Sequence, residues 1–284
     1  MLMPSYKITV AYDGTDFVGW QRQANGISVQ ALIEDALREL DGRDVTVTGA
    51  GRTDAGVHAL GQVAAFTIAR ELEPDALARA LNAHLPHAIR VLTAMNAPPA
   101  FHPRFGARAK TYRYCLWNGD VMSPFERRYA WHVPGPLDIE AMRTAARLLE
   151  GRHDFAAFRA TGSSVATTER EIFISRIADC GLRIGEESAV ESAVESAIES
   201  AIESAIRNPQ SAMLTYEVAS TGFLRHMVRI IVGSLVEIGR GRQPVEWISR
   251  AIASRDRAAA GPTAPPHGLF LVRVDYGRAT PPSD

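Results

Sequence analysis

Residues 45–68, VTVTGAGRTDAGVHALGQVAAFTI, form the stretch that decides the fold class of this chain. Its β-branched and apolar residues predict two strands, over 45–48 and 62–68, with a glycine-rich loop between them. Three of the eight positions 49–56 are glycine, which allows backbone conformations that other residues avoid. These two strands form the centre of a longer pattern of strands and helices.

The elements on either side complete a β-α-β-β-α-β order. Apolar residues at i, i+3, i+4, i+7, i+8 and i+11 from Val29 predict an amphipathic helix over 28–40, with Ser28 as its N-cap. A strand is expected before it, over 6–12. After the central strands we expect a helix over 74–85, which has proline in its first turn, and a strand over 89–97. This order is typical of a ferredoxin-like unit.

A second half of similar character follows a proline-rich joint at Pro98, Pro99 and Pro103. Its pattern predicts strands over 110–117, 155–158 and 269–276, a long hairpin over 170–184 and 212–220, and helices over 138–150, 223–238 and 244–253. We therefore predict an α+β protein with an N-terminal half at 1–104 and a C-terminal half at 105–284. Side by side, two such halves are expected to share one wide, largely antiparallel sheet.

One segment is of low complexity. Residues 187–206 are five copies of the tetrapeptide Glu-Ser-Ala-Val/Ile. A period of four drifts by about 40° per repeat around a helix, and glutamates four residues apart repel each other. The favoured interpretation is a solvated insertion at about 186–207, in the turn of the long hairpin, because lengthening a surface loop costs little. A partner-binding arm is the alternative.

Composition and charge exclude several classes of protein. The chain has 46% hydrophobic and 22% charged residues, as globular proteins do, and no apolar run of the roughly 20 residues that span a bilayer. We find no signal peptide pattern, and two cysteines without C-x-x-C spacing favour a reduced, cytoplasmic protein. Six glutamates within 186–206 hide a basic body, since without them the net charge rises from −1 to +5. That body is compatible with RNA binding.

The glycine-rich loop also carries chemistry. Arg52 and Asp54 stand two residues apart within it, so a guanidinium and a carboxylate lie where the backbone can approach a ligand closely. The simplest interpretation is a tight turn, in which Asp54 makes an Asx-turn and Arg52 is solvated. A phosphate-binding P-loop is excluded, because no Gly-Lys-Ser/Thr and no helix follow.

Six stretches, in chain order, point to one family. Residues 51–59 (GRTDAGVHA) strongly resemble the signature of the tRNA pseudouridine synthase A family. Residues 11–15 (AYDGT) with 17–23 (FVGWQRQ), and 105–114 (FGARAKTYRY), are similar to its N-terminal segment and its tyrosine motif. Residues 155–159 (FAAFR), 223–236 (FLRHMVRIIVGSLV) and 268–272 (GLFLV) resemble three further blocks. The resemblance covers nearly the whole chain and departs at the repeat, where relatives usually have a short turn.

The resemblance implies an isomerase that converts uridine to pseudouridine in the anticodon stem-loop of tRNA, at tRNA positions 38, 39 and 40. It also implies the pseudouridine synthase fold, in which two ferredoxin-like halves enclose the active-site cleft, and a homodimer. The reaction oxidises nothing and releases no group. We therefore expect no cofactor and no metal.

The resemblance also assigns residues. Asp54 is the expected catalytic carboxylate, which either forms an ester at C1′ or abstracts the 2′ proton. Tyr112 matches the active-site tyrosine and would stack on the uracil, unless it is an inward-facing core aromatic. Arg52 would pair with Asp54, hold a phosphate or fill the gap left by an extruded base. Leu269 or Leu271 resembles the apolar residue beside the base.

Basic residues outside the loop are candidates for binding RNA. Arg225, His226 and Arg229 lie on the predicted helix over 223–238, with Arg225 and Arg229 four residues apart on one side. Together with them, four further cations would line an RNA groove: Arg22, Arg104, Arg108 and Lys110. Two alternatives stay open, a non-catalytic RNA-binding protein and a synthase acting on another RNA. The RNA-recognition signature typical of the first is missing from the sequence.

Overall fold

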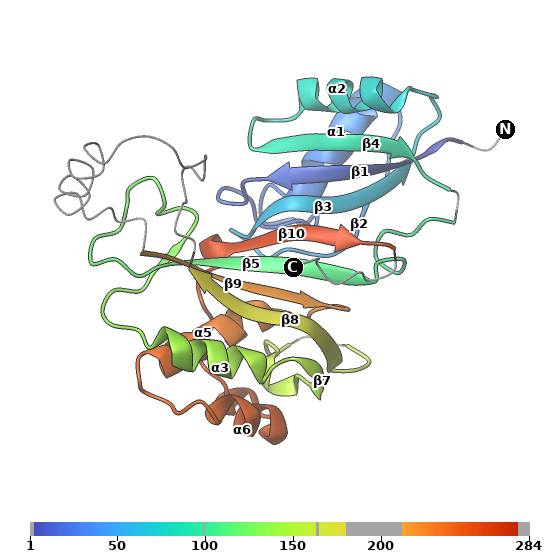
Figure 1. Ribbon diagram of the computed structural model, residues 1–284. Coiled ribbons are helices and arrows are strands. Elements are labelled where there is room, and N and C mark those ends of the chain that lie inside the picture. The colour runs from blue at the N-terminus through green and yellow to red at the C-terminus, as the bar shows by residue number, and fades with distance from the viewer. Residues whose placement is uncertain (1–2, 99, 163–164, 180–211, 278–284) are drawn as a thin grey trace, which may run out of the picture.

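The computed structural model describes residues 3–98, 100–162, 165–179 and 212–277, and their strands form one twisted sheet (Figure 1). Its main path runs β4-β1-β3-β10-β5-β9-β8-β7, with β2 paired to β3 and β6 to β5. Only the β3–β10 and β5–β6 pairings are parallel within the described residues. The strands are β1 (Ser5–Tyr12), β2 (Thr48–Gly49), β3 (His58–Thr67), β4 (Ile89–Asn96), β5 (Ala109–Trp117), β6 (Trp131–His132), β7 (Gly151–Asp154), β8 (Glu169–Asp179), β9 (Met213–Ser220) and β10 (Leu269–Asp275).

The helices fall into two groups, one for each half of the sheet. In Figure 1, α1 and α2 lie with β1, β3 and β4 in the upper half, whereas α3, α5 and α6 lie with the strands below β5. The strand orders β4-β1-β3-β2 and β10-β5-β9-β8 are those of two ferredoxin-like units, so the predicted α+β fold is confirmed. The helical elements are α1 (Val29–Asp41), α2 (Pro74–His84), α3 (Ile139–Arg147), η1 (Ala156–Phe158), α5 (Met227–Gly239), α6 (Trp247–Ser254), η3 (Arg257–Ala259) and η4 (Pro266–Gly268).

Strand β10 joins the halves, because it pairs with β3 on one side and with β5 on the other. The register places one row of side chains on the same face of the sheet across this seam. Its members are successive Cα partners and are all buried: Tyr12, Ala59, Leu271, Tyr112 and Val218. The row brings the end of β1 and the start of β3 close to the middle of β5. The candidate site lies against this row of side chains.

The sequence patterns explain why these elements form. Helix α1 buries Val29, Ile33 and Leu37 on its apolar stripe, and each such burial contributes about 1.5–3 kcal/mol. Ser28 caps the helix by accepting a hydrogen bond from Ala31 N at 3.3 Å, as predicted. One hydrophobic cluster runs through both halves. The division at residue 104 therefore stays a prediction.

The predicted strand over 45–48 is wrong except at its end, where Thr48–Gly49 form β2. The backbone of Val47 finds its partners in side chains of α1 instead of in a strand. Its carbonyl accepts from Gln30 Nε2 at 2.8 Å, and its N–H donates to Glu34 Oε1 at 3.1 Å. Buried and exposed residues do alternate here, as the strand prediction assumed. The strand-to-strand hydrogen bonds of a sheet are nevertheless missing at Val47.

Two further expectations need correction. Residues 156–158 form a 3₁₀ turn instead of a strand, since Phe155 and Phe158 are three residues apart and both fully buried. The helix predicted over 223–238 begins only at Met227, because His226 adopts φ 61°, the left-handed conformation that no continuous helix contains. The insertion at about 186–207 lies outside the described residues.

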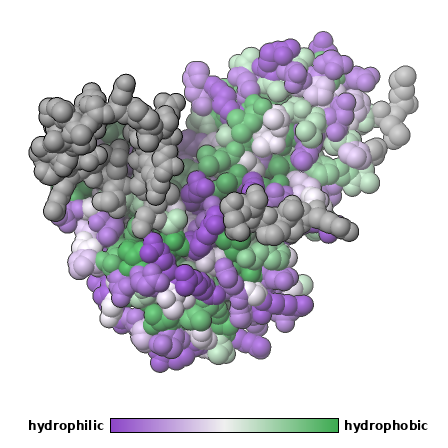
Figure 2. Space-filling model, viewed as in Figure 1, coloured by the Kyte–Doolittle hydropathy of each residue, from purple (hydrophilic) through white to green (hydrophobic). Residues whose placement is uncertain are grey.

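The surface is mixed. On the face drawn in Figure 2, hydrophobic side chains form small groups between hydrophilic ones, as is normal for globular proteins. Among the helices that the structure describes, none has the length and apolar character needed to cross a membrane.

Candidate active site

The loop between β2 and β3 rests directly on the segment that follows β1. A Cβ on Gly14 would lie 2.0 Å from the carbonyl oxygen of Val57, and a Cβ on Gly19 would lie 2.4 Å from that of Thr53. The two backbones are tied by hydrogen bonds from Trp20 N to Thr53 O at 3.2 Å and from Gly56 N to Phe17 O at 3.3 Å. Glycine is therefore required at positions 14 and 19, since any side chain would push the loop away.

Buried polar side chains hold the loop from the sheet side. The hydroxyl groups of Tyr12 and Thr53 are 2.8 Å apart, and Gln62 Nε2 donates to Gly51 O at 2.9 Å. Burial raises the pKa of Tyr12 to about 12, although its hydrogen bonds act against this shift, so its hydroxyl stays neutral. The loop is thus fixed on both sides of Asp54.

Asp54 projects from this loop with its side chain 31% exposed, and it meets the start of α5. Its Oδ2 lies 3.2 Å from Arg229 Nη1 and 3.4 Å from His226 Nε2. Arg229 is itself anchored, because its Nε donates to Ala264 O at 2.8 Å and its carbonyl accepts from Ala264 N at 3.0 Å. Asp54 is therefore a carboxylate that a ligand can reach and that a fixed cation compensates.

His226 contributes a polar contact and not a charge at neutral pH. Burial lowers its pKa below the ordinary 6.5, and the charges of Arg229, Arg225 and Arg257 add to that effect, while the carboxylate of Asp54 opposes it. Its backbone at φ 61° turns the chain from residue 225 into α5. This turn places His226 and Arg229 on the same oxygen of Asp54.

Tyr112 lies on the row of side chains beneath Asp54. Its ring meets that of Phe223 edge-on, with 5.0 Å between the centroids, and only 7% of the residue is exposed. Burial raises the pKa of Tyr112, and the neighbouring Tyr12 hydroxyl and Asp54 carboxylate raise it further. The hydroxyl of Tyr112 therefore keeps its proton at neutral pH.

The second tyrosine of β5 belongs to the core. Tyr114 is fully buried and donates to Pro265 O at 2.8 Å. Leu269 is its Cα partner on β10, whereas Leu271 is the partner of Tyr112. Leu269 follows the η4 turn directly, and Pro266 of that turn would lie 3.0 Å from a Cβ on Gly56. Both leucines are buried.

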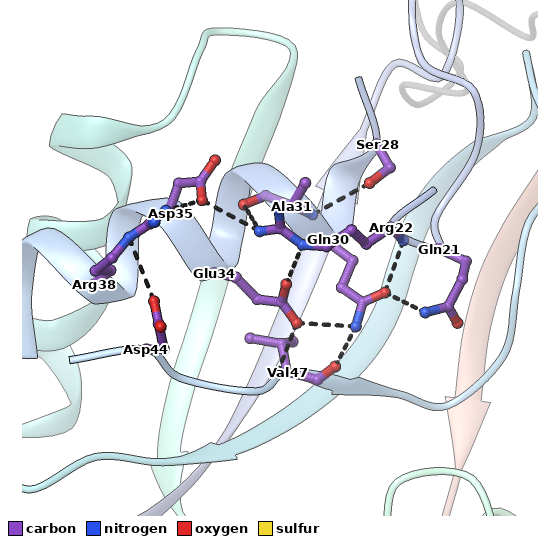
Figure 3. Close-up of polar contacts among 10 residues, drawn as sticks. All are labelled: Gln21, Arg22, Ser28, Gln30, Ala31, Glu34, Asp35, Arg38, Asp44 and Val47. Atoms are coloured by element: carbon purple, nitrogen blue, oxygen red, sulfur yellow. Dashed lines mark hydrogen bonds and ion pairs between the residues drawn. The ribbon is translucent and has the colours of Figure 1, made fainter. Parts of the chain in front are cut away.

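Arg52 does not form the ion pair with Asp54 that its spacing suggested. It is exposed, and its Nε donates to Gln21 Oε1 at 3.1 Å. The partners of Asp54 are His226 and Arg229 from α5 instead. Gln21 in turn donates to Gln30 of α1 at 2.7 Å (Figure 3). A short chain of amides therefore links Arg52 to α1.

The cations predicted to bind RNA do not all gather at the site. Arg22 lies along α1, where its guanidinium bonds to Glu34 at 2.6 Å and to Asp35 at 3.2 Å (Figure 3). Arg229 and His226 contact Asp54, and Lys110 lies beside Gly51 of the loop. Arg225 is exposed on the turn before α5. The structure thus places one predicted cation, Arg22, in a network of its own.

The sequence analysis missed a buried cluster around His58. Its Nδ1 accepts from Gly14 N at 3.0 Å and lies 3.1 Å from Asp13, while its Nε2 lies 3.1 Å from the carbonyls of both Arg128 and His267. Tyr129 donates to the other oxygen of Asp13 at 2.9 Å. Burial lowers the pKa of His58, so the ring is neutral and its proton lies on Nε2.

The cluster holds Asp13 ionised. Burial alone would raise the pKa of Asp13, but hydrogen bonds from Thr15 and Tyr129 together outweigh it and leave the pKa below its ordinary value. The contacts of His58 join four segments that lie far apart in the sequence. No spacing pattern in the sequence predicts such contacts. Over the described part of the chain, no group of three or more His, Cys, Asp or Glu side chains is arranged to hold a metal ion.

Comparison with known proteins agrees with this geometry. A family model described as tRNA pseudouridine synthase matches residues 8–106 and 145–277. Proteins named tRNA pseudouridine synthase A are 43% identical to the chain in Syntrophotalea carbinolica, over 96% of this chain and 97% of the relative, and in Myxococcus xanthus, over 99% and 95%. The relative from Nitrobacter winogradskyi is 43% identical over 98% of each chain. The chain therefore belongs to the tRNA pseudouridine synthase family.

Proposed function

We propose that Asp54 is the carboxylate with which this protein isomerises uridine to pseudouridine in tRNA. The observation that carries the proposal is the setting of its side chain. Asp54 is partly exposed, is held by Arg229 at 3.2 Å, and lies near enough to buried Tyr112 for its charge to raise the pKa of that hydroxyl. Members of this family are isomerases that act on uridine in tRNA. The geometry supplies what that reaction needs.

The reaction breaks the bond between N1 of uracil and C1′ of ribose, turns the base, and joins C5 to C1′. C1′ becomes electron-poor on the way, so an ionised carboxylate nearby is favourable. Asp54 either attacks C1′ to form an ester or removes the 2′ proton to give a glycal. Both routes use a carboxylate oxygen of Asp54, and Arg229 holds that carboxylate in place at 3.2 Å. Neither route requires an oxidant or reductant.

Other side chains have roles that follow from their positions. The ring of Tyr112 offers a surface on which the uracil can stack, and its neutral hydroxyl can relay the C5 proton released at the end. Leu269, buried near Gly56, supplies apolar contact for the base. Arg52 is exposed at the rim and suits a phosphate or the gap left by the extruded base. No step assigned here uses a cofactor or metal.

We further propose that the substrate region is the anticodon stem-loop, at tRNA positions 38, 39 and 40. Phosphate contacts would come from the remaining candidates, Lys110 and Arg225, and from Arg22 if it leaves its partners on α1. A homodimer and a cytoplasmic location belong to the same proposal. Solution size measurement tests the dimer, and an active monomer at micromolar concentration would contradict it.

The deciding experiment incubates the purified protein with an unmodified tRNA that carries uridine at position 39. Pseudouridine is then mapped by chemical labelling. We expect product from the wild type and from Asp75→Asn, an exposed control on α2, but none from Asp54→Asn. Product from Asp54→Asn would overturn the assigned carboxylate and leave the reaction. Tight tRNA binding without product from any variant would favour a non-catalytic RNA-binding protein.

A further inference from the structure

A second feature of the site is a lysine, Lys110, whose side chain lies beside the loop that carries Asp54. Lys110 lies on β5 two residues before Tyr112, so both side chains project from the same face of the sheet. A Cβ on Gly51 would lie 3.3 Å from the Lys110 Nζ. The ammonium group therefore lies beside Gly51, three residues before Asp54.

Two arginines approach this ammonium from other segments. Ser220 is the Cα partner of both Lys110 and Ile172, and Arg170 stands two residues before Ile172 on β8, on the same face. Arg104 comes from the segment between β4 and β5. Burial lowers the pKa of Lys110 to about 8, and the positive charges of Arg104 and Arg170 act in the same direction. Lys110 and Arg170 thus project from one face of the sheet, and Arg104 lies near enough for its charge to act on Lys110.

Among the described residues, none supplies a counter-charge to these cations. Within the ranges that the structure describes, no carboxylate lies in ion-pair distance of Lys110, Arg104 or Arg170, although nearby strands carry such pairs, as Arg113 with Glu217. Arg170 donates only to the backbone carbonyls of Thr167 and Glu169. Like charges held together in a half-buried place disfavour each other. An anion bound between them would remove that cost.

We propose that Lys110, Arg104 and Arg170 bind one phosphate of the RNA backbone, in the strand that carries the target uridine. The inference rests on the proposed function for the RNA that brings the phosphate. A guanidinium offers paired N–H donors to phosphate oxygens, and the ammonium adds a point charge. Because Lys110 contacts the Asp54 loop and shares a face with Tyr112, this phosphate lies close to the extruded nucleotide. The site fixes where the strand enters.

Equilibrium binding tests the site without turnover. The full chain in an Asp54→Asn background is titrated with an anticodon stem-loop RNA at several salt concentrations. We expect Lys110→Gln and Arg170→Gln each to weaken binding about tenfold. Each should also reduce the slope of log K against log salt, and the two changes combined should reduce it by about 0.7–0.9, the value for one phosphate contact. Lys110→Arg should keep both affinity and slope, which shows that a charge is needed and not a particular shape.

A matched control and a chemical probe locate the phosphate. Arg79→Gln removes an exposed cation on α2 and should leave the slope unchanged. RNAs with one neutral methylphosphonate linkage at each position flanking the uridine are then tested against Lys110→Gln. At one linkage the two changes should not add, because they remove the same contact. Equal melting temperatures for Lys110→Gln and Lys110→Arg exclude misfolding as the cause.

The outcomes separate this site from the proposed function. An unchanged salt slope in Lys110→Gln, or full additivity at every linkage, would overturn the phosphate site while wild-type pseudouridine formation stands. Absence of product from the wild type, with the slope change and the coupling intact, would instead overturn the proposed function and leave an RNA-phosphate site.

Discussion

Arg229 makes a shorter polar contact with Asp54 than His226 does. It is 13% exposed, contacts the carboxylate at 3.2 Å and is tied to Ala264 through its own Nε. We predict that Arg229→Gln lowers kcat for pseudouridine formation by about 10²-fold, the usual effect of losing one fixed donor at a reacting group, with KM changed less than about threefold. Single-turnover assays with excess enzyme measure this effect.

Two variants serve as controls for a folding defect in Arg229→Gln. Arg240→Gln removes an arginine at the other end of α5, where it pairs with Glu237, and should leave kcat unchanged. Arg229→Lys keeps the charge and should recover part of the lost rate. Wild-type kcat in a folded Arg229→Gln protein would show that Asp54 needs no cation.

The same residues show how far a sequence predicts a site. Asp54 lies on the predicted loop and Tyr112 on the predicted strand, now β5, while the roles assigned to them stay predictions. The partner of Asp54 is different, because Arg229 stands 175 positions further along the chain while Arg52 stands two positions away. Spacing along a chain reports local neighbours. Contacts made when two halves close over a sheet leave no such periodic signal.

At the scale of elements, the patterns succeeded where burial alone shapes the backbone. Helix α1 and strand β1 follow their 3.6- and 2-residue periods, since one face of each is buried. They failed where side chains replace the ladder, as around Val47, whose backbone is bonded by Gln30 and Glu34. Strand β7 was missed because its four residues, GRHD, contain no apolar alternation.

The contact between the segment after β1 and the loop that carries Asp54 is the element-scale feature with the clearest consequence. A Cβ at position 14 would meet the Val57 carbonyl at 2.0 Å, and neither backbone has a flexible end that can move aside. We predict that Gly14→Ala lowers the free energy of unfolding by about 1–3 kcal/mol, in the range of overpacked sites, and also lowers kcat. Urea unfolding and tRNA assays on the same preparation measure the two effects.

Gly42→Ala separates strain from loop displacement. Gly42 ends α1 at φ 72° with nothing within 4 Å of the new Cβ. It should cost about 1 kcal/mol of stability from backbone strain and leave kcat unchanged. If Gly14→Ala changed stability but not kcat, the contact would support the fold without positioning Asp54.

At the scale of the whole molecule, the site exists only because β10 closes the seam. Asp54 comes from the first half, Tyr112 and Arg229 from the second, and the row from Tyr12 to Val218 passes through β10. The contacts between the two halves along this seam are buried, and several of them are made by histidine side chains. Their titration should therefore affect the folding of both halves together.

Three histidines at these contacts have a pKa lowered from 6.5, in each case chiefly by burial: His58, His226 and His267. A lowered pKa means that the unfolded chain binds protons at a pH where the folded chain does not. Stability is therefore complete above about pH 6.5, and it falls as the pH drops from there towards the folded pKa values. The contribution of Asp13 has the same sign but is lost only below its ordinary 3.8.

We predict that the free energy of unfolding decreases as the pH falls from 6.5 to 5, and that it rises slightly as the pH passes about 8, because burial lowers the pKa of Lys110 to about 8. His58, only 1% exposed, should contribute at most about 1.4 kcal/mol per pH unit to this slope. Urea unfolding at a series of pH values measures it. His58→Gln should be less stable at pH 8, because Gly14 and two carbonyls lose their partner, yet should show a shallower loss on acidification. His84→Gln, on the exposed side of α2, is the matched control, and an equal slope in both variants would contradict the role of His58.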